Sequence, residues 1–266
     1  MITVLSWGIG GSVVSGGRHG RAWLGQSRGG AVDLASYALA NRLVGNVSAA
    51  GCFETSGGFA LEVDAPTMVA MTGALAPVTI ERGPPLGWGN PVVLPPGARL
   101  RLGRLADGAR VYIGIRGGVD SVGATVGADP GTAAAEQPAA RHAPNFSIRI
   151  WPGPRAHWFH PDAWLQLLSA EYVVADTSRI GARLVGPSLQ RARVDELPSE
   201  GLVEGAVQVP PDGQPIIMLA DHPTTGGYPV IAVVDAADLP AVAQAAPGTS
   251  LRFVDATRRQ SPPVLV

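Results

Sequence analysis

Glycine and proline punctuate this chain at short intervals along its whole length. Of its 266 residues, 35 are Gly and 24 are Pro, and they lie between short apolar runs. This spacing is typical of an all-β chain in which many turns connect short strands. We therefore expect a mainly β protein with a few short helices.

The apolar runs define the expected strands, and three other segments have helical features. Asp33–Leu43 has an acidic N-cap candidate and is followed by a Gly-Asn stop signal. Pro161–Leu168 and Asp235–Gln244 begin with residues that suit a first helical turn. Strands are expected over Ala60–Val63, Met68–Thr72, Val78–Glu81, Arg99–Leu102, Arg110–Ile115, Ser147–Trp151, Ala182–Val185, Gln214–Ala220, Val230–Val234 and Ser250–Asp255.

Two distant segments have similar sequences, which bears on the number of domains. Residues 96–102 read PGARLRL and residues 247–253 read PGTSLRF, and a strand containing Met precedes each. A duplication would give two similar barrels in tandem, over residues 1–145 and 146–266, although a turn with an amphipathic strand also recurs by chance. Residues 120–145 are rich in Ala, Gly and Pro. They are expected to form a linker or a mobile loop over an active site.

All 20 basic residues of the chain are arginine, and there is no lysine. A phosphate-binding loop of the Walker A type needs a lysine, as do Schiff-base chemistry and pyridoxal phosphate. Biotin and lipoyl groups are also attached through lysine. The sequence therefore excludes these functions for the chain by itself.

Charge and hydropathy exclude two further classes of partner. The formal net charge is −1 and the arginines form no stripe, so a nucleic-acid partner is not expected. No run approaches 18 apolar residues, so no membrane partner is expected. Met1–Val4 lacks a basic signal-peptide start, and the single cysteine, Cys52, cannot pair within the chain. A cytoplasmic protein is the expectation.

The densest group of polar residues lies between 221 and 228. Asp221 could move a proton if it is buried, and Thr hydroxyls beside glycine amides can form an anion cradle. The same residue types also form ordinary turns, so both interpretations stay open. The candidates in this segment are Asp221, Thr224, Thr225, Gly226, Gly227 and Tyr228.

Four further residues are candidates on weaker grounds. Glu200 and Gln208 lie near apolar segments and have no evident turn function, although a solvated surface would explain them equally well. Arg179 and Arg183 are four residues apart, and their guanidinium forks suit a carboxylate or phosphate, or ordinary ion pairs. No metal site is expected, because His157 and His160 lack a third ligand nearby.

Several of these segments together resemble one protein family. The chain is similar to allophanate hydrolase subunit 2, also described as the C-type subunit of 5-oxoprolinase, and to the biotin-dependent carboxyltransferase-like domain of urea amidolyase. The resemblance covers most of the chain. It lies in residues 29–33 (GGAVD), 40–46 (ANRLVGN), 71–74 (MTGA), 116–120 (RGGVD), 178–184 (SRIGARL), 197–201 (LPSEG), 205–215 (GAVQVPPDGQP) and 224–229 (TTGGYP).

The resemblance implies a fold, an activity and partners. The fold would be two tandem cyclophilin-like β-barrel domains. The activity would be that of one component of an amide or lactam hydrolase, with ATP-dependent ring opening of 5-oxoproline to glutamate as the first candidate. A subunit 1 or B-type protein would share the site, and a third, A-type protein would join it. ATP would act in the complex, and biotin would come only from a partner.

The resemblance also suggests roles for the candidate residues. Asp221 or Glu200 would move protons, and Arg179 would neutralise developing oxyanion charge. The Thr-Thr-Gly-Gly segment would hold a carboxylate or phosphate, with Tyr228 orienting the substrate. The chain departs from the family at residues 15–20, which lack an acid, at His222-Pro223, where an arginine is absent, and after Asp120. A changed substrate, a non-catalytic regulatory or scaffolding role, and a carboxyltransferase component therefore stay open.

Overall fold

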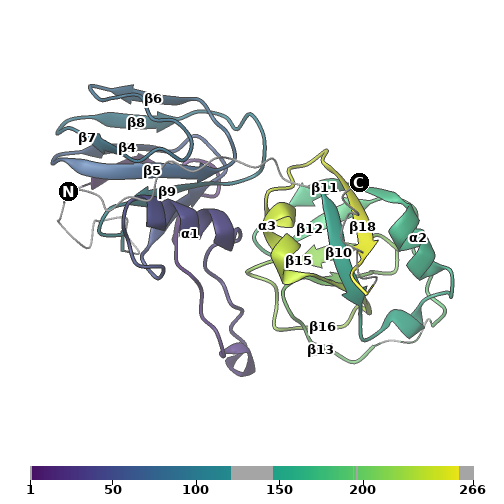
Figure 1. Cartoon of the computed structure of the whole chain (residues 1–266). Helices are drawn as coiled ribbons and strands as arrows, with labels where there is room; N and C mark the ends of the chain where they lie inside the picture. Colours follow the sequence, from purple (N-terminus) through teal and green to yellow (C-terminus); the bar gives the residue numbers. More distant parts are fainter. Residues whose placement is uncertain (1, 121–145, 194, 196, 258–266) are drawn as a thin grey trace, which may run out of the picture. The chain divides into compact units, whose positions relative to one another are not determined.

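The computed structural model describes residues 2–120, 146–193, 195 and 197–257 (Figure 1). The chain divides into two compact units, an N-terminal unit of Met1–Gly20 with Arg28–Pro144 and a C-terminal unit of Arg21–Ser27 with Asn145–Val266. The prediction of a mainly β protein with a few short helices is confirmed. The predicted linker lies outside the described residues except for Asp120.

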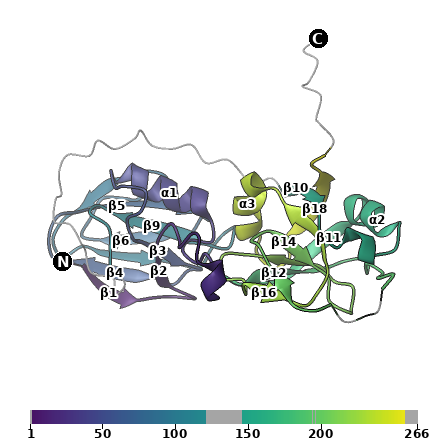
Figure 2. The same ribbon diagram turned by 90° about the horizontal axis from the view of Figure 1, so that it is seen from below.

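The strands of the N-terminal unit form two sheets (Figures 1 and 2). The four-stranded sheet has the order β1(Ile2–Ser6), β4(Ala60–Val63), β8(Arg99–Leu102), β6(Val78–Glu81). The five-stranded sheet has the order β2(Ser12–Val14), β3(Cys52–Thr55), β9(Val111–Ile115), β5(Thr67–Gly73), β7(Val92–Leu94). Neighbouring strands within each sheet are antiparallel.

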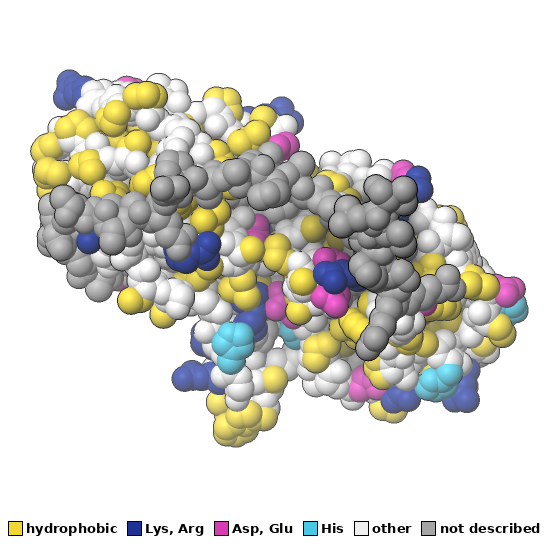
Figure 3. All heavy atoms as spheres, in the orientation of Figure 1, with side chains coloured by type: hydrophobic (Ala, Val, Ile, Leu, Met, Phe, Trp, Pro, Cys, Tyr) yellow, Lys and Arg dark blue, Asp and Glu magenta, His cyan; other side chains and the backbone are white. Residues whose placement is uncertain are grey.

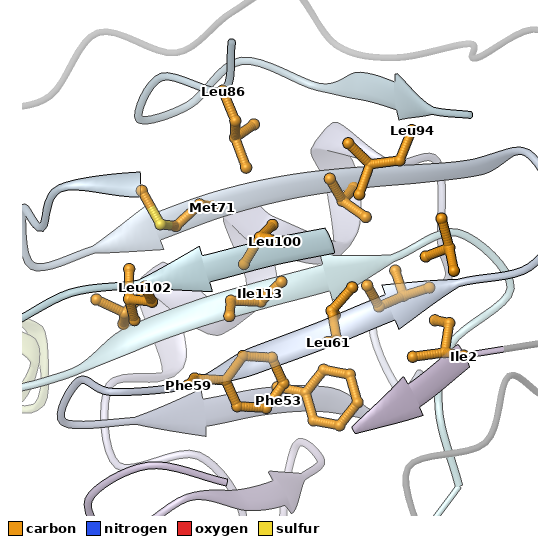
Figure 4. Packing of buried hydrophobic residues seen from close by; sticks show 14 of the residues in the cluster. Ile2, Phe53, Phe59, Leu61, Met71, Leu86, Leu94, Leu100, Leu102 and Ile113 are labelled. Atoms are coloured by element: carbon orange, nitrogen blue, oxygen red, sulfur yellow. The ribbon is translucent and has the colours of Figure 1, made fainter. Parts of the chain in front are cut away.

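The main core of this unit combines side chains from both sheets (Figure 4). Leu61 and Leu100 come from the first sheet, and Phe53 and Ile113 come from the second. The next residue along each of β3 and β9 faces the other way, because successive side chains of a strand alternate between its faces. Phe53 also packs on Phe59, with ring centroids 4.9 Å apart.

Helix α1(Leu34–Leu43) covers the other face of the five-stranded sheet. Asp33 is its N-cap, as predicted, and its Oδ1 accepts a hydrogen bond of 2.9 Å from the Ser36 amide. The helix lies very close to β9, because a Cβ at Gly114 would be only 2.5 Å from the Ala40 carbonyl oxygen. Only glycine fits at this crossing.

A buried hydrogen-bond network joins α1 to the sheet beneath it. Tyr112, which is fully buried, donates a hydrogen bond of 2.7 Å to Oε2 of Glu54. The same oxygen accepts one of 3.0 Å from the Val32 amide, and the Tyr112 hydroxyl accepts one of 2.8 Å from the Asp33 amide. Burial and the neighbouring carboxylates hold the pKa of Tyr112 well above its usual value. The network therefore fixes the chain where it enters α1.

The C-terminal unit is a closed barrel of seven strands. Its order is β10(Ser147–Pro152), β17(Val230–Val234), β14(Ala206–Gln208), β15(Ile216–Met218), β12(Gly181–Val185), β11(Glu171–Thr177), β18(Ser250–Asp255). The barrel closes through the parallel pairing of β10 with β18, and the other neighbours are antiparallel. A separate two-stranded ribbon pairs β13(Glu200–Gly201) with β16(Thr225–Gly226).

Short helices accompany the barrel. Helix α2(Ala163–Ser169) packs on β18, and the 3-10 helix η2(Ala156–Trp158) packs on β17. The helix expected over Asp235–Gln244 is instead η3(Ala236–Asp238) followed by α3(Leu239–Ala243). Pro240 in the first turn of α3 explains this, because proline cannot donate the amide hydrogen bond that a continuous helix needs. In the described part of the chain, no helix is long and apolar enough to cross a membrane.

Candidate functional site

The β13–β16 ribbon brings together candidates that are distant in the sequence. Glu200 lies opposite Gly226, and Gly201 lies opposite Thr225. A hydrogen bond of 2.9 Å from the Leu202 amide to the Thr224 carbonyl extends the pairing. Glu200 and the Thr-Thr-Gly segment therefore belong to one structural element, which local sequence patterns do not reveal.

Gln208 supports this ribbon from the barrel. Its side chain is buried, and Nε2 donates a hydrogen bond of 3.0 Å to the Tyr228 carbonyl. The register of β14 against β17 shifts between Val207 and Gln208, and such bulges redirect side chains. A Cβ at Gly226 would be 2.8 Å from Gln208 Nε2, so any larger residue would push on this amide group. Gln208 thus positions the loop that carries Tyr228.

Glu200 is held in place by Arg155, a residue that the sequence analysis did not single out. Arg155 Nε and Nη2 donate hydrogen bonds of 3.0 and 2.7 Å to Oε2 of Glu200. This bond raises the pKa of Arg155 above its usual value. Arg155 follows a Pro-Gly-Pro turn after β10, and no motif in the sequence marks it. The ion pair with Arg155 fixes the position of the Glu200 carboxylate on the ribbon.

Arg179 and Asp221 form a second pair of candidates. Arg179 Nε donates a hydrogen bond of 2.7 Å to Asp221 Oδ2, and Nη2 donates one of 3.3 Å to Oδ1. The Asp221 amide also bonds to the Arg179 carbonyl, at 2.9 Å. The two charges compensate each other. Either residue could move a proton or stabilise an oxyanion only after the hydrogen bonds of this ion pair break.

The remaining candidates differ in their surroundings. Arg183 is exposed on β12, opposite Asp176 and Ile216, and among the described residues it forms no hydrogen bond or ion pair with another candidate. Tyr228 is 45% exposed, and Thr225 and Gly227 are exposed as well. Thus the ribbon, Gln208 and Tyr228 form one cluster, and Arg179 with Asp221 forms another.

His222 lies in the turn just before β16, at the position where the family resemblance predicts an arginine. It is buried, and its Nδ1 lies 2.7 Å from the Pro223 carbonyl. Over the described residues, no three His, Cys, Asp or Glu side chains gather closely enough to hold a metal ion. His222 therefore belongs to the turn that leads into the ribbon.

Comparison with known proteins places the chain in a family. The carboxyltransferase domain family, subdomain A and B, matches residues 24–129 and 121–255. The chain belongs to this family. It is 32% identical to the C-type subunit of 5-oxoprolinase from Escherichia coli (strain K12), over 98% of this chain and 93% of that protein. It is 28% identical to urea amidolyase of Lachancea kluyveri, over 90% of this chain but 16% of that protein.

Solved structures in the comparison share the fold of this carboxyltransferase-family chain. The crystal structure of TTHA0988 superposes with a TM-score of 0.84 at 30% sequence identity, over 96% of this chain and 55% of that chain. Urea amidolyase of K. lactis gives a TM-score of 0.84 at 25% identity, over 96% of this chain and 18% of that chain. The chain therefore spans about half of the first structure and a smaller part of the second.

Proposed function

We propose that this chain is a subunit of a hetero-oligomeric enzyme that hydrolyses amide or lactam bonds. The first candidate reaction is the ATP-dependent opening of 5-oxoproline to glutamate. The observation that carries the proposal is the 32% identity to the C-type subunit of a 5-oxoprolinase, which extends over 98% of this chain and 93% of that protein. A match over nearly the whole of both chains favours a shared role within an assembly.

The geometry of the ribbon supports a substrate-holding role. The Thr225 hydroxyl and the Gly227 amide would bind a carboxylate or the polarised carbonyl of the lactam, while Gly226 pairs with Glu200 across the ribbon. Glu200, oriented by Arg155 at 2.7 Å, would act on a proton at the lactam nitrogen or on the attacking water. Tyr228 would orient the substrate from the adjacent exposed position.

The charged pair at Arg179 and Asp221 would act beside the ribbon. Opening of their hydrogen bonds on substrate binding would leave Arg179 free to neutralise an oxyanion and Asp221 free to move a proton. Arg183, exposed on β12, would join as a substrate-binding residue only if a partner protein packed over that face. These roles follow from charge and position.

The assembly would need other subunits for the rest of the chemistry. With no lysine, this chain has neither a phosphate-loop lysine nor an attachment point for biotin. We propose a subunit 1 or B-type partner and a third, A-type partner, with ATP bound at the level of the complex. Biotin, if used, would be carried by another protein.

Reconstitution of the complex tests this proposal. The chain would be co-expressed with its B-type and A-type partners, and glutamate would be measured after addition of 5-oxoproline and ATP. We expect ATP-dependent glutamate release that disappears when this chain is omitted. Absence of turnover on 5-oxoproline, allophanate and urea would contradict an enzymatic role and favour a regulatory or scaffolding one.

Carboxyl transfer is a second candidate, favoured by the match to the carboxyltransferase domain family and to urea amidolyase. In this case the chain would move a carboxyl group to or from biotin held by a partner. The discriminating measurement uses labelled bicarbonate, ATP and a biotinylated carrier with its carboxylase. Label appearing in urea only when this chain is present would favour transfer over hydrolysis.

A further inference from the structure

Residues 191–193 run alongside η2 of the C-terminal unit. The Ala192 and Arg193 amides donate hydrogen bonds of 2.8 and 3.2 Å to the Trp158 carbonyl. Arg191 forms an isolated antiparallel β-bridge with Phe159. This pairing places two guanidinium groups, those of Arg191 and Arg193, on the same short segment. Neither residue belongs to a recognised motif.

Arg191 is half-buried, and no carboxylate in the described part of the chain is hydrogen-bonded to it. Its Nη2 donates to the Val209 carbonyl, while Nε is buried and has no hydrogen-bond partner among the described residues. Burial lowers the pKa of Arg191, and the nearby charge of Asp212 offsets this only in part. Burying a guanidinium that lacks an acceptor at Nε is unfavourable, so an anion at the accessible part of this half-buried group would offset the cost of its charge.

Arg193 is exposed and lies over the face of Trp158, 5.7 Å from the ring centroid. The ring orients the guanidinium and leaves its N–H groups at the edge available to a ligand. Four other arginines of this unit have acidic partners: Arg149 with Asp238, Arg155 with Glu200, Arg179 with Asp221 and Arg252 with Glu171. Figure 3 shows basic and acidic side chains side by side near α3, where the first of these pairs lies.

The two arginines adjoin the candidate site. The carbonyl that Arg191 binds belongs to Val209, whose amide donates a hydrogen bond of 3.1 Å to the Pro229 carbonyl. Arg155, the partner of Glu200, lies over the same Trp158 ring as Arg193, 5.9 Å from its centroid. Arg191 is therefore linked through Val209 to the loop that carries Tyr228, and Arg193 shares the Trp158 ring with Arg155, the partner of Glu200.

We propose that Arg191 and Arg193 bind the carboxylate of a small substrate or product. The inference rests on the proposed function, for which 5-oxoproline carries one carboxylate beside its lactam ring. A planar guanidinium suits a planar carboxylate, because two parallel N–H donors match its two oxygens. The arginines would anchor the carboxylate while the ribbon faces the bond to be hydrolysed.

Calorimetric titration of the full chain and of the reconstituted complex tests this assignment. The probes are 5-oxoproline, its uncharged carboxamide, and inorganic phosphate. The variants are Arg191→Lys and the exposed Arg193→Gln, with Arg252→Gln, an exposed arginine of the same unit, as control. We expect 5-oxoproline to bind more tightly than the carboxamide or phosphate, and each variant to weaken it roughly tenfold or more. The control should stay within about twofold.

The outcomes separate this inference from the proposed function. Wild-type affinity in both variants, equal affinity for the carboxamide, or equal affinity for phosphate would overturn the carboxylate site even if the complex turns over 5-oxoproline. Carboxylate binding that depends on Arg193 would uphold it even if the complex shows no turnover. Circular dichroism identifies a variant that fails to fold, and Arg193→Gln, at an exposed position, then decides the question.

Discussion

Replacing Gly226 with alanine should destabilise the C-terminal unit by about 1–3 kcal/mol and strongly reduce activity of the complex. The added Cβ would be 2.7 Å from Leu202 Cδ1 and 2.8 Å from Gln208 Nε2. Both atoms lie at the ends of buried side chains, so relieving the contact requires these side chains to repack. Displacement of Gln208 would also break its hydrogen bond to the Tyr228 carbonyl and shift the loop.

Gly201→Ala is the matched control for the stability change. Gly201 belongs to the other strand of the same ribbon, and a Cβ there has nothing within 4 Å. Chemical unfolding of the two variants in parallel measures the difference. Equal stability of Gly226→Ala and Gly201→Ala would show that the ribbon does not pack on Gln208 and Leu202 as described.

Replacing Glu54 with alanine should destabilise the N-terminal unit by about 3 kcal/mol or more. The substitution leaves the Val32 amide and the Tyr112 hydroxyl without their shared acceptor, Oε2 of Glu54, which lies 3.0 and 2.7 Å from them. These groups are buried, so water does not readily replace the lost acceptor. The start of α1 would loosen as a consequence.

Glu62→Ala provides the control for this second prediction. Glu62 lies on β4 of the same unit and pairs with Arg99 at 2.9 Å, but both side chains are substantially exposed. Its removal should change the unfolding free energy by less than about 1 kcal/mol. Denaturant titration followed by circular dichroism compares the two. A loss for Glu54→Ala as small as that for Glu62→Ala would contradict the network.

Much of the strand pattern could be predicted because Gly and Pro delimit strands with alternating side chains. β17(Val230–Val234) and β18(Ser250–Asp255) have the predicted bounds. β3(Cys52–Thr55) was not predicted, because its four residues, CFET, form neither an alternating pattern nor a continuous apolar run. β13 and β16, with two residues each, are too short for any periodicity to indicate.

The site could be predicted in its composition but not in its pairings. Polar residues beside a glycine pair marked the segment that contains Thr225 and Gly226, and Glu200 was selected separately. Their alignment across the ribbon is a contact between segments that are distant in the chain, and local sequence patterns do not predict such contacts. The same limit hid Arg155 and Arg191, because their importance comes from Glu200 and Val209, which are distant in the chain.

We propose that the ribbon at Glu200 holds the substrate of an amide-hydrolysing complex. The most direct measurement is kcat/KM for ATP-dependent glutamate release from 5-oxoproline by complexes carrying Glu200→Gln or Glu171→Gln. Both carboxylates pair with an arginine of the same unit, at 2.7 Å for Glu200 and 2.8 Å for Glu171. Glu171 lies on β11 and belongs to neither strand of the ribbon. We expect a loss of about tenfold or more for Glu200→Gln and wild-type activity for Glu171→Gln. Equal activity of the two variants would contradict it.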